Sequence, residues 1–333
     1  MRTLRDGYLG LMVLCGLGTI GLSTAVGADD SAQSTNATLL LVVGASGAPQ
    51  FQPMFTEWAD RWLSAASKGG YRTVVIGRDA EQPDQADKQR LRAAIEETAG
   101  SPGNALWLVM IGHGTYDRRE ARFNLRGPDV SAVELAGWLK AVDRPMAIVN
   151  SGSASAPFVP ILSGPRRVVI AATKSGAEQN FARFGDFLSQ AIGDTSADLD
   201  KDEQTSLWEA YLRASRKTAE FYTTDGRLQT EHALLDDNGD GLGVRAEQFR
   251  GLTPIEEATG GKSLDGESAH QWHLLRNPTD AALPPEVLKK RDALETTILQ
   301  LRSRKKTMER EVYYQELERL LIELAELNES GTR

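Results

Sequence analysis

The chain has 333 residues, of which 41% are apolar and 25% charged, a composition typical of a globular protein with a sizeable core. The length suits one α/β domain with appended segments. A formal net charge of -8 argues against a nucleic-acid partner, because phosphate binding needs Lys and Arg clustered on one face, and it leaves carboxylates available for cations.

The first 28 residues have the layout of a secretory signal peptide. Arg2 and Arg5 precede an apolar stretch from Tyr8 to Val26, and the small residues that end at Ala28 are typical of a cleavage site. We expect cleavage near Ala28 and export, periplasmic or secreted, without stable membrane insertion afterwards. The competing interpretation is an uncleaved membrane anchor, since the apolar stretch approaches the ~20 residues that span a bilayer. Cys15 is the only cysteine, so the cleaved chain would contain neither a disulfide nor a thiol nucleophile.

Residues 29–36 form a polar linker, and from residue 37 to residue 193 apolar runs alternate with segments of helical periodicity. This alternation predicts an α/β fold of three layers, a parallel sheet with helices on both faces. The expected strands are Thr38–Val43, Tyr71–Ile76, the run from Ala105 to His113, the run from Arg144 to Asn150, and Arg167–Thr173. The expected helices are Phe51–Ser67, Asp87–Thr98, Val130–Val142, Ala156–Ser163 and Phe181–Ile192.

Two chemically useful groups fall at strand ends. His113 follows the third expected strand between two glycines, and Ser151 follows the fourth, at the start of a run of small hydroxyl residues. In open parallel sheets, ligands bind beyond the carboxyl ends of the strands, so both groups are aimed at one crevice. Ser151 alternatively belongs to a small-residue turn in which a serine caps the next helix.

These two segments resemble the caspase and legumain-like peptidase fold, in which a strand-end His-Gly and a later Ala-Cys-x-Ser-Gly bring a His and a Cys together. The family's His-Gly aligns with Ile111-Gly112-His113-Gly114. Its nucleophile motif aligns with Val149-Asn150-Ser151-Gly152-Ser153-Ala154-Ser155, which places Ser151 at the position of the catalytic Cys. A slip of one residue puts Gly152 there instead. The resemblance covers roughly Ala37 to Leu188, lacks the family's thiol, and implies an oxyanion donor at the Gly114 amide.

The missing thiol leaves two classes of function open. As an enzyme, the chain would be an endopeptidase with Ser151 as nucleophile, His113 as base and Gly114 as oxyanion donor. A serine hydroxyl needs such a base hydrogen-bonded to it, commonly oriented by a third group, and no third group is evident in the sequence. As a binding protein, the chain would be a pseudo-peptidase that keeps the fold as an exported interaction module for a peptide or protein partner. We predict the binding protein, with the endopeptidase as the alternative.

Residues 194–250 contain two acidic segments with the spacing of EF-hand loops, which bind Ca²⁺ through oxygen ligands at positions one, three, five, seven, nine and twelve. The first loop offers Asp198, Asp200, Asp202, Gln204, Ser206 and Glu209, and the second offers Asp236, Asn238, Asp240, Leu242 and Glu247. At position six, where the pattern wants glycine, the first loop has Glu203 and the second has Gly241. We therefore predict two calcium sites with the second dominant, separated by a helix over Leu207–Tyr222.

After an irregular linker over residues 251–284, with a strand-like piece at Gln271–Leu275, the chain is strongly helical from residue 285 to residue 330. One apolar seam contains Leu294, Ile298, Leu301, Met308 and Val312, and a second contains Tyr313, Leu317, Leu320, Leu324 and Leu327. The change of phase between them predicts a coiled-coil stutter or two helices. Because such seams need a partner, we expect a homo-oligomer or a partner bound through this tail, or else packing of the tail on the main domain.

Overall fold

The computed structural model describes residues 37–79, 85–101, 103–255 and 265–331. The expected signal peptide, its alternative as a membrane anchor, and the linker after it all lie outside these residues. Within the described ranges, no helix is both long and apolar enough to cross a membrane.

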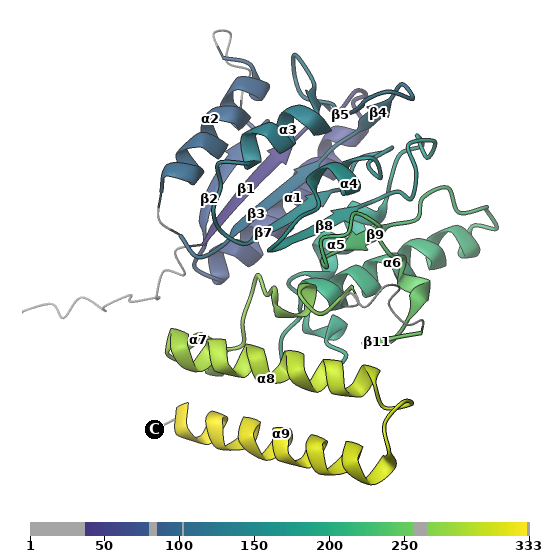
Figure 1. The fold of residues 1–333 in the computed structure, drawn as a ribbon. Coiled ribbons are helices and arrows are strands. Elements are labelled where there is room, and N and C mark those ends of the chain that lie inside the picture. The colour runs from purple at the N-terminus through teal and green to yellow at the C-terminus, as the bar shows by residue number, and fades with distance from the viewer. Residues whose placement is uncertain (1–36, 80–84, 102, 256–264, 332–333) are drawn as a thin grey trace, which may run out of the picture. The chain divides into compact units, whose positions relative to one another are not determined.

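A six-stranded sheet forms the centre of the fold, with the strand order β2-β1-β3-β7-β8-β9 (Figure 1). The first five strands in this order are parallel, and β9 runs antiparallel to β8 at the edge. The strands are β1 (Thr38–Val43), β2 (Arg72–Ile76), β3 (Leu106–Ile111), β7 (Met146–Asn150), β8 (Arg167–Ala171) and β9 (Leu234–Asp236). Every residue of β1, β3 and β7 is buried, which explains why these strands are continuous apolar runs.

Helices cover both faces of the sheet, so the expected α/β class with three layers is confirmed. Successive strand residues point to opposite faces: Leu39 and Leu41 lie in one core, and Leu40 and Val42 lie in the other. The first core also takes residues of α1, α5 and α6, and the second takes residues of α2, α3 and α4. These helices are α1 (Phe51–Lys68), α2 (Asp87–Gly100), α3 (Ala132–Leu139), α4 (Phe158–Leu162), α5 (Phe184–Ala191) and α6 (Leu207–Thr224).

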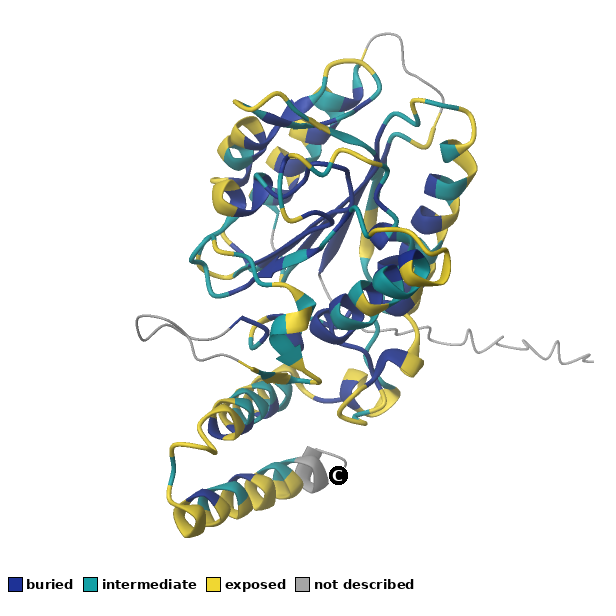
Figure 2. Ribbon diagram, turned by 90° about the vertical axis from the view of Figure 1, so that its right-hand side faces the viewer, coloured by how far each residue is buried: buried dark blue, intermediate teal, exposed yellow. Residues whose placement is uncertain are grey.

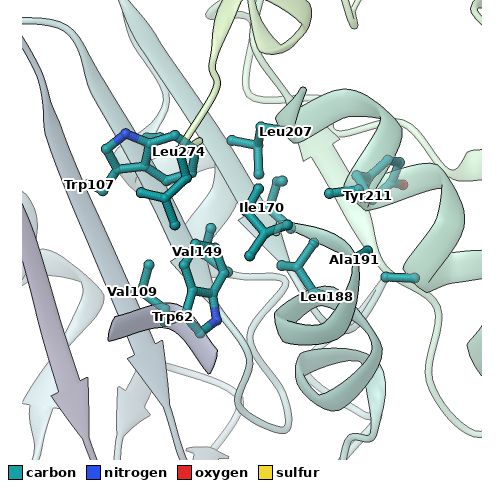
Figure 3. Packing of buried hydrophobic residues seen from close by; sticks show 14 of the residues in the cluster. Trp62, Trp107, Val109, Val149, Ile170, Leu188, Ala191, Leu207, Tyr211 and Leu274 are labelled. Carbon is teal, nitrogen blue, oxygen red and sulfur yellow. The ribbon is translucent and has the colours of Figure 1, made fainter. Parts of the chain in front are cut away.

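Large aromatic and aliphatic side chains build the first core (Figure 3). The rings of Trp62 on α1 and Trp107 on β3 have centroids 6.0 Å apart. Leu188 of α5 lies beside Ile170 of β8 in the same view. Figure 2 shows the strands buried between helices that keep exposed outer faces. Burial of apolar side chains on both faces therefore stabilises the sheet and fixes the positions of the carboxyl ends of its strands.

Several short elements were not expected from the sequence. A small antiparallel sheet contains β4 (Gly114–Tyr116), β5 (Ala121–Phe123) and β6 (Val130–Ser131), and β10 (Phe249–Arg250) pairs with β11 (Thr253–Pro254). The 3₁₀ helices are η1 (Thr195–Ala197), η2 (Ala246–Gln248) and η4 (Ala269–Gln271). The predicted strand-like piece at Gln271–Leu275 is reduced to one bridge: Gln271 ends η4, and His273 pairs with Ser206 in an isolated antiparallel bridge.

The C-terminal tail contains two separate long helices, not one stuttered helix. They are α8 (Pro285–Ser303) and α9 (Arg310–Gly331), preceded by the short α7 (Pro278–Ala281). Ile298 and Leu301 of α8 and Tyr313 and Leu320 of α9 form a small core of their own. We call α8 and α9 the C-terminal hairpin. Self-association through this hairpin stays a prediction.

We predict that Leu108→Ala in β3 lowers the free energy of unfolding by about 2–5 kcal/mol, because a fully buried leucine would leave a cavity beneath the sheet. Guanidinium denaturation followed by circular dichroism measures the change. Leu228→Ala is the matched control, since Leu228 is 90% exposed, and its expected effect is within about 0.5 kcal/mol. Equal effects at the two positions would contradict the packing described here.

Candidate functional site

His113 lies just beyond β3, on the same face of the sheet as α1. Its ring is half-buried and contacts Phe51, Phe55 and Phe181, with centroids 4.8, 5.2 and 5.8 Å from that of the imidazole. Phe51 and Phe55 are one turn apart on α1, so the helix presents both rings to the strand end. The imidazole is thus held in an apolar aromatic pocket.

Burial lowers the pKa of His113 below its usual value, and a hydrogen bond to the backbone carbonyl of Ser46 opposes this shift only in part. The Nε2 atom of His113 lies 3.1 Å from that carbonyl oxygen. A carbonyl oxygen only accepts, so we assign the proton of the neutral ring to Nε2. At neutral pH the imidazole is therefore uncharged, with Nε2 already engaged.

Ser151 follows β7 and lies on the same face of the sheet as His113. The residue is only 1% exposed. Its side chain packs against α5, where a Cβ placed on Gly185 would lie 2.6 Å from Ser151 Cβ and 2.9 Å from its Oγ. Among the hydrogen bonds of the described residues, none joins Ser151 to His113. The structure brings the predicted pair to one edge and one face of the sheet without joining the two side chains.

The backbones of the two strand ends approach each other closely at glycines. A Cβ on Gly152 would lie 3.2 Å from the carbonyl carbon of His113 and 3.3 Å from the amide nitrogen of Gly114. A Cβ on Gly114 would lie 2.3 Å from the carbonyl oxygen of Ser153, so a side chain at Gly114 would clash with backbone. Position 152 of the slipped alignment is thus the one whose side-chain direction points at the His113–Gly114 backbone. The oxyanion role of Gly114 stays a prediction.

The first acidic loop gathers three carboxylates. Asp198, Asp200 and Asp202 each offer an oxygen, and these atoms lie within 4.8 Å of one another. Asp198 accepts from the amides of Lys201, at 2.5 Å, and Glu203, at 3.1 Å. In the part of the chain that the structure describes, no other cluster of three or more Asp, Glu, His or Cys meets the same limit. The predicted ligand positions one, three and five are therefore brought together.

The end of the first loop is fixed by the start of α6. Ser206 caps this helix in a reciprocal pair with Glu209: Ser206 N donates to Glu209 Oε2 over 2.8 Å, and Glu209 N donates to Ser206 Oγ over 3.2 Å. Leu199 N donates to Glu209 Oε1 over 2.6 Å. The carboxylate of Glu209, at position twelve, therefore contacts the loop at Leu199. Burial raises the pKa of Glu209. The predicted residues Ser206 and Glu209 close the loop, and Gln204 lies between them and Asp202.

The two loops share left-handed residues at positions four and six. Lys201 and Glu203, at positions four and six of the first loop, have φ of 67° and 68°. Gly239 and Gly241, at the same positions of the second loop, have φ of 76° and 75°. Glu203 thus adopts the left-handed turn that usually needs glycine, at a cost of about 1–2 kcal/mol. Replacement of glycine at position six has not prevented the turn.

Groups distant in the sequence surround the first loop, and the sequence analysis did not assign them to it. His270 Nε2 lies 2.8 Å from Asp200 Oδ2, and Arg291 lies 3.8 Å from Asp202 Oδ2. Burial raises the pKa of Asp202 to about 6, with a further contribution from the charge of Asp200. Burial also acts to raise the pKa of Asp200, but the hydrogen bond and charge of His270 outweigh it, and the net shift is downward.

The second loop begins at the end of β9. Asp236 is fully buried; its Oδ1 accepts from Gly239 N over 3.1 Å, while its Oδ2 has no well-formed hydrogen bond. Burial raises the pKa of Asp236, and the nearby Ser163 hydroxyl, itself without a well-formed partner, opposes this only in part. Asn238 Oδ1 accepts from Asp240 N over 2.9 Å, within the loop.

The far end of the second loop differs from that of the first. Leu242 is 73% exposed, and Glu247 is exposed in η2, where it lies 3.9 Å from Arg245. Val244 returns to pair with Leu235 of β9 through two backbone hydrogen bonds of 2.8 and 2.9 Å. A short 3₁₀ helix therefore replaces the helix that follows the first loop. The carboxylates of Asp236, Asp240 and Glu247 do not form a cluster like that of the first loop.

Comparisons with known proteins give structural likenesses only. No protein-family model matches the chain, and neither does any curated protein. The Drosophila initiator caspase Dronc is similar with a TM-score of 0.41 and 13% identity, over 72% of this chain and 95% of that one. Caspase-1 from Spodoptera frugiperda has a TM-score of 0.40 and 9% identity, over 61% of this chain and 87% of its own. A secreted C11 cysteine protease from Bacteroides thetaiotaomicron has a TM-score of 0.36 and 11% identity, over 63% and 66%.

We predict that the ring protons of His113, followed by NMR, titrate with a pKa below 6.5, because the aromatic pocket disfavours the charged ring. A histidine whose folded pKa is lowered stabilises the fold above its unfolded pKa. This contribution is lost as the pH falls through the lowered value, because unfolding then takes up a proton. A His113 pKa at or above 6.5 would contradict this account of the pocket.

Proposed function

We propose that this chain is an exported calcium-binding protein whose caspase-like α/β domain serves as an interaction module and has no peptidase activity. The observation that carries the calcium part is the convergence of Asp198, Asp200 and Asp202 at EF-hand spacing. The proposal of a non-catalytic domain rests on the state of His113 and Ser151. Export rests on the sequence of residues 1–28.

The surroundings of Ser151 disfavour a nucleophile. A serine attacks only when a base hydrogen-bonded to it accepts its proton. Ser151 is enclosed by Gly185 and its neighbours, and Nε2 of His113 is directed to the Ser46 carbonyl. The absence of a thiol in the mature chain acts in the same direction. We therefore infer that His113 and Ser151 do not form an activated base and nucleophile.

The alternative is an active endopeptidase that uses Ser151 and His113. One observation favours it: both residues lie on the same face and at the same edge of the sheet, as their alternation with Val149 and Ile111 of the first core indicates. Catalytic hydrogen bonds are often long or absent before substrate binds. A movement of α5, which carries Gly185, away from Ser151 would then be required to expose the Ser151 hydroxyl.

A peptidase assay over a peptide library separates the two functions. We expect no hydrolysis by the wild-type chain above the level of Ser151→Ala and His113→Ala, because no activated nucleophile is present. Ser153→Ala is the matched control for loss of a buried hydroxyl in the same turn. Hydrolysis by the wild type and Ser153→Ala that disappears in both other variants would establish the endopeptidase instead.

Calcium suits both loops because they offer carboxylate and carbonyl oxygens and no nitrogen or sulfur ligand within the predicted set. The shared left-handed residues at positions four and six support the same loop path in each. In the second loop, the buried Oδ2 of Asp236 lacks a well-formed hydrogen bond, which supports a role for this oxygen as a cation ligand. The geometry favours the first loop as the stronger site, the reverse of the ranking expected from Glu203.

Calcium at a hundredfold above its dissociation constant should stabilise the fold by about 2.7 kcal/mol, a rise of several degrees in Tm. Differential scanning calorimetry with calcium, with magnesium and with chelator measures this gain. Asp198→Asn and Asp236→Asn form a matched pair, since each removes the charge at position one of its loop. We expect Asp198→Asn to remove more of the gain. No heat and no shift in Tm at millimolar calcium would refute the calcium proposal.

The partner of the module is proposed to be a peptide or protein, and the C-terminal hairpin is a second surface for association. Val312, Leu321 and Ile322 of α9 are exposed apolar residues that the packing of α9 on α8 leaves uncovered. These residues support the proposed homo-oligomer through the hairpin.

A further inference from the structure

We propose that the C-terminal hairpin and the first acidic loop are one cooperative unit, in which a cation bound by the loop locks α8 onto the α/β domain. This inference rests on the proposed calcium function and extends it to the hairpin. It names His270 and Arg291 as positioning residues for the cation ligands.

The segment from η4 to α8 contacts the first loop at successive points. Asn277 Nδ2 donates to the backbone oxygen of Asp202 over 2.9 Å, and Gln204 Nε2 donates to Asp280 Oδ2 over 2.8 Å. Arg291 of α8 forms an ion pair with Asp280 and lies 3.8 Å from Asp202. Position five of the loop is therefore contacted from α8, and position seven from α7.

Position three is contacted from η4. His270 is 5% exposed, and its Nε2 lies 2.8 Å from one oxygen of Asp200. The imidazole occupies only one of the two oxygens of Asp200. Such a contact orients a metal ligand without replacing the metal.

The charges at this junction do not balance. The carboxylates at the junction are Asp200, Asp202, Glu209, Asp280, Asp292 and Glu295. The cations that face them are His270, Arg276 and Arg291. Of these carboxylates only Glu209 and Asp280 are buried, and Asp280 is paired with Arg291, while Asp200 is exposed and Asp202 is partly exposed. The excess of negative charge over these cations favours a further cation at the first loop. The first loop holds the oxygens that a divalent ion would use.

Coupling between the ion and the hairpin follows from these shared carboxylates. His270 and Arg291 hold Asp200 and Asp202 in place against their mutual repulsion, so docking of α8 favours ion binding. By thermodynamic reciprocity, the bound ion favours docking of α8 by the same factor. Partners that hydrogen-bond to metal ligands commonly change metal affinity by about 10–100-fold.

Hydrogen exchange of the full chain with and without calcium tests the coupling. If release of α8 requires loss of the ion, calcium at a hundredfold above its dissociation constant should slow exchange of α8 amides by about a hundredfold. Amides of β3 provide the internal reference. Asp198→Asn, which removes a ligand that the described contacts of α7 and α8 do not touch, should abolish the calcium effect on α8.

Calcium titration calorimetry of Arg291→Met tests the positioning role. We measure it in an Asp240→Asn background, so that the remaining heat comes from the first loop. We expect the dissociation constant to rise by about 10–100-fold, with partial rescue in Arg291→Lys. Arg304→Met is the matched control, because Arg304 follows α8 and lies about 20 Å further along the helix.

The outcomes separate this inference from the function on which it rests. Calcium heat in the wild type with no change in α8 exchange would overturn the coupling and leave calcium binding intact. An Arg291→Met effect no larger than that of Arg304→Met would overturn the positioning role. If Arg291→Met does not fold, the exchange experiment with Asp198→Asn decides. Absence of any calcium heat would refute the calcium proposal itself, and the coupling with it.

Discussion

The burial of a parallel sheet between two helical layers fixes where each candidate residue lies. Because side chains alternate between the faces, the residues that follow β3 and β7 inherit a side from the strand before them. His113 and Ser151 fall on the face covered by α1 and α5, where the helices also supply Phe51, Phe55 and Gly185. The packing that stabilises this face is the same packing that encloses Ser151. The side-chain packing that stabilises this face therefore also keeps the Ser151 hydroxyl away from solvent.

Buried carboxylates present the second constraint on the molecule. In the first loop, backbone amides of Lys201 and Glu203 donate to Asp198, and His270 and Arg291 supply positive charge from outside the loop. Backbone amides satisfy oxygens but do not cancel charge. A divalent cation at this loop, as proposed above, would do both.

Elements with a strong periodic signal could be predicted from the sequence. The strand Thr38–Val43 has the predicted bounds, and α6 begins at Leu207 as expected, because the continuous apolar run and the Ser206–Glu209 cap are local signals. The strands β4, β5 and β6 have two or three residues each and carry no periodicity. They pair with one another in a separate small sheet, which no periodic pattern in the sequence indicates.

The contacts of the candidate site depend on residues far apart in the chain. His270 lies 70 residues from Asp200, and Ser46 lies 67 residues from His113, so no spacing rule links them. No pattern in the sequence therefore linked His270 to the first loop. The left-handed backbone of Glu203 was not predictable from its residue type either, and its amide donates a hydrogen bond to Asp198. The ranking of the two loops as calcium sites stays a prediction.

The return of Val244 to pair with Leu235 has a consequence for the behaviour of the protein in concentrated solution. A strand at the margin of a sheet exposes unpaired amides and carbonyls that can recruit a strand from another molecule. Here β9 is three residues long, runs against the direction of its neighbours, and has its outer side occupied by the second acidic loop. The second acidic loop thereby covers part of this edge, which disfavours edge-to-edge pairing with another molecule.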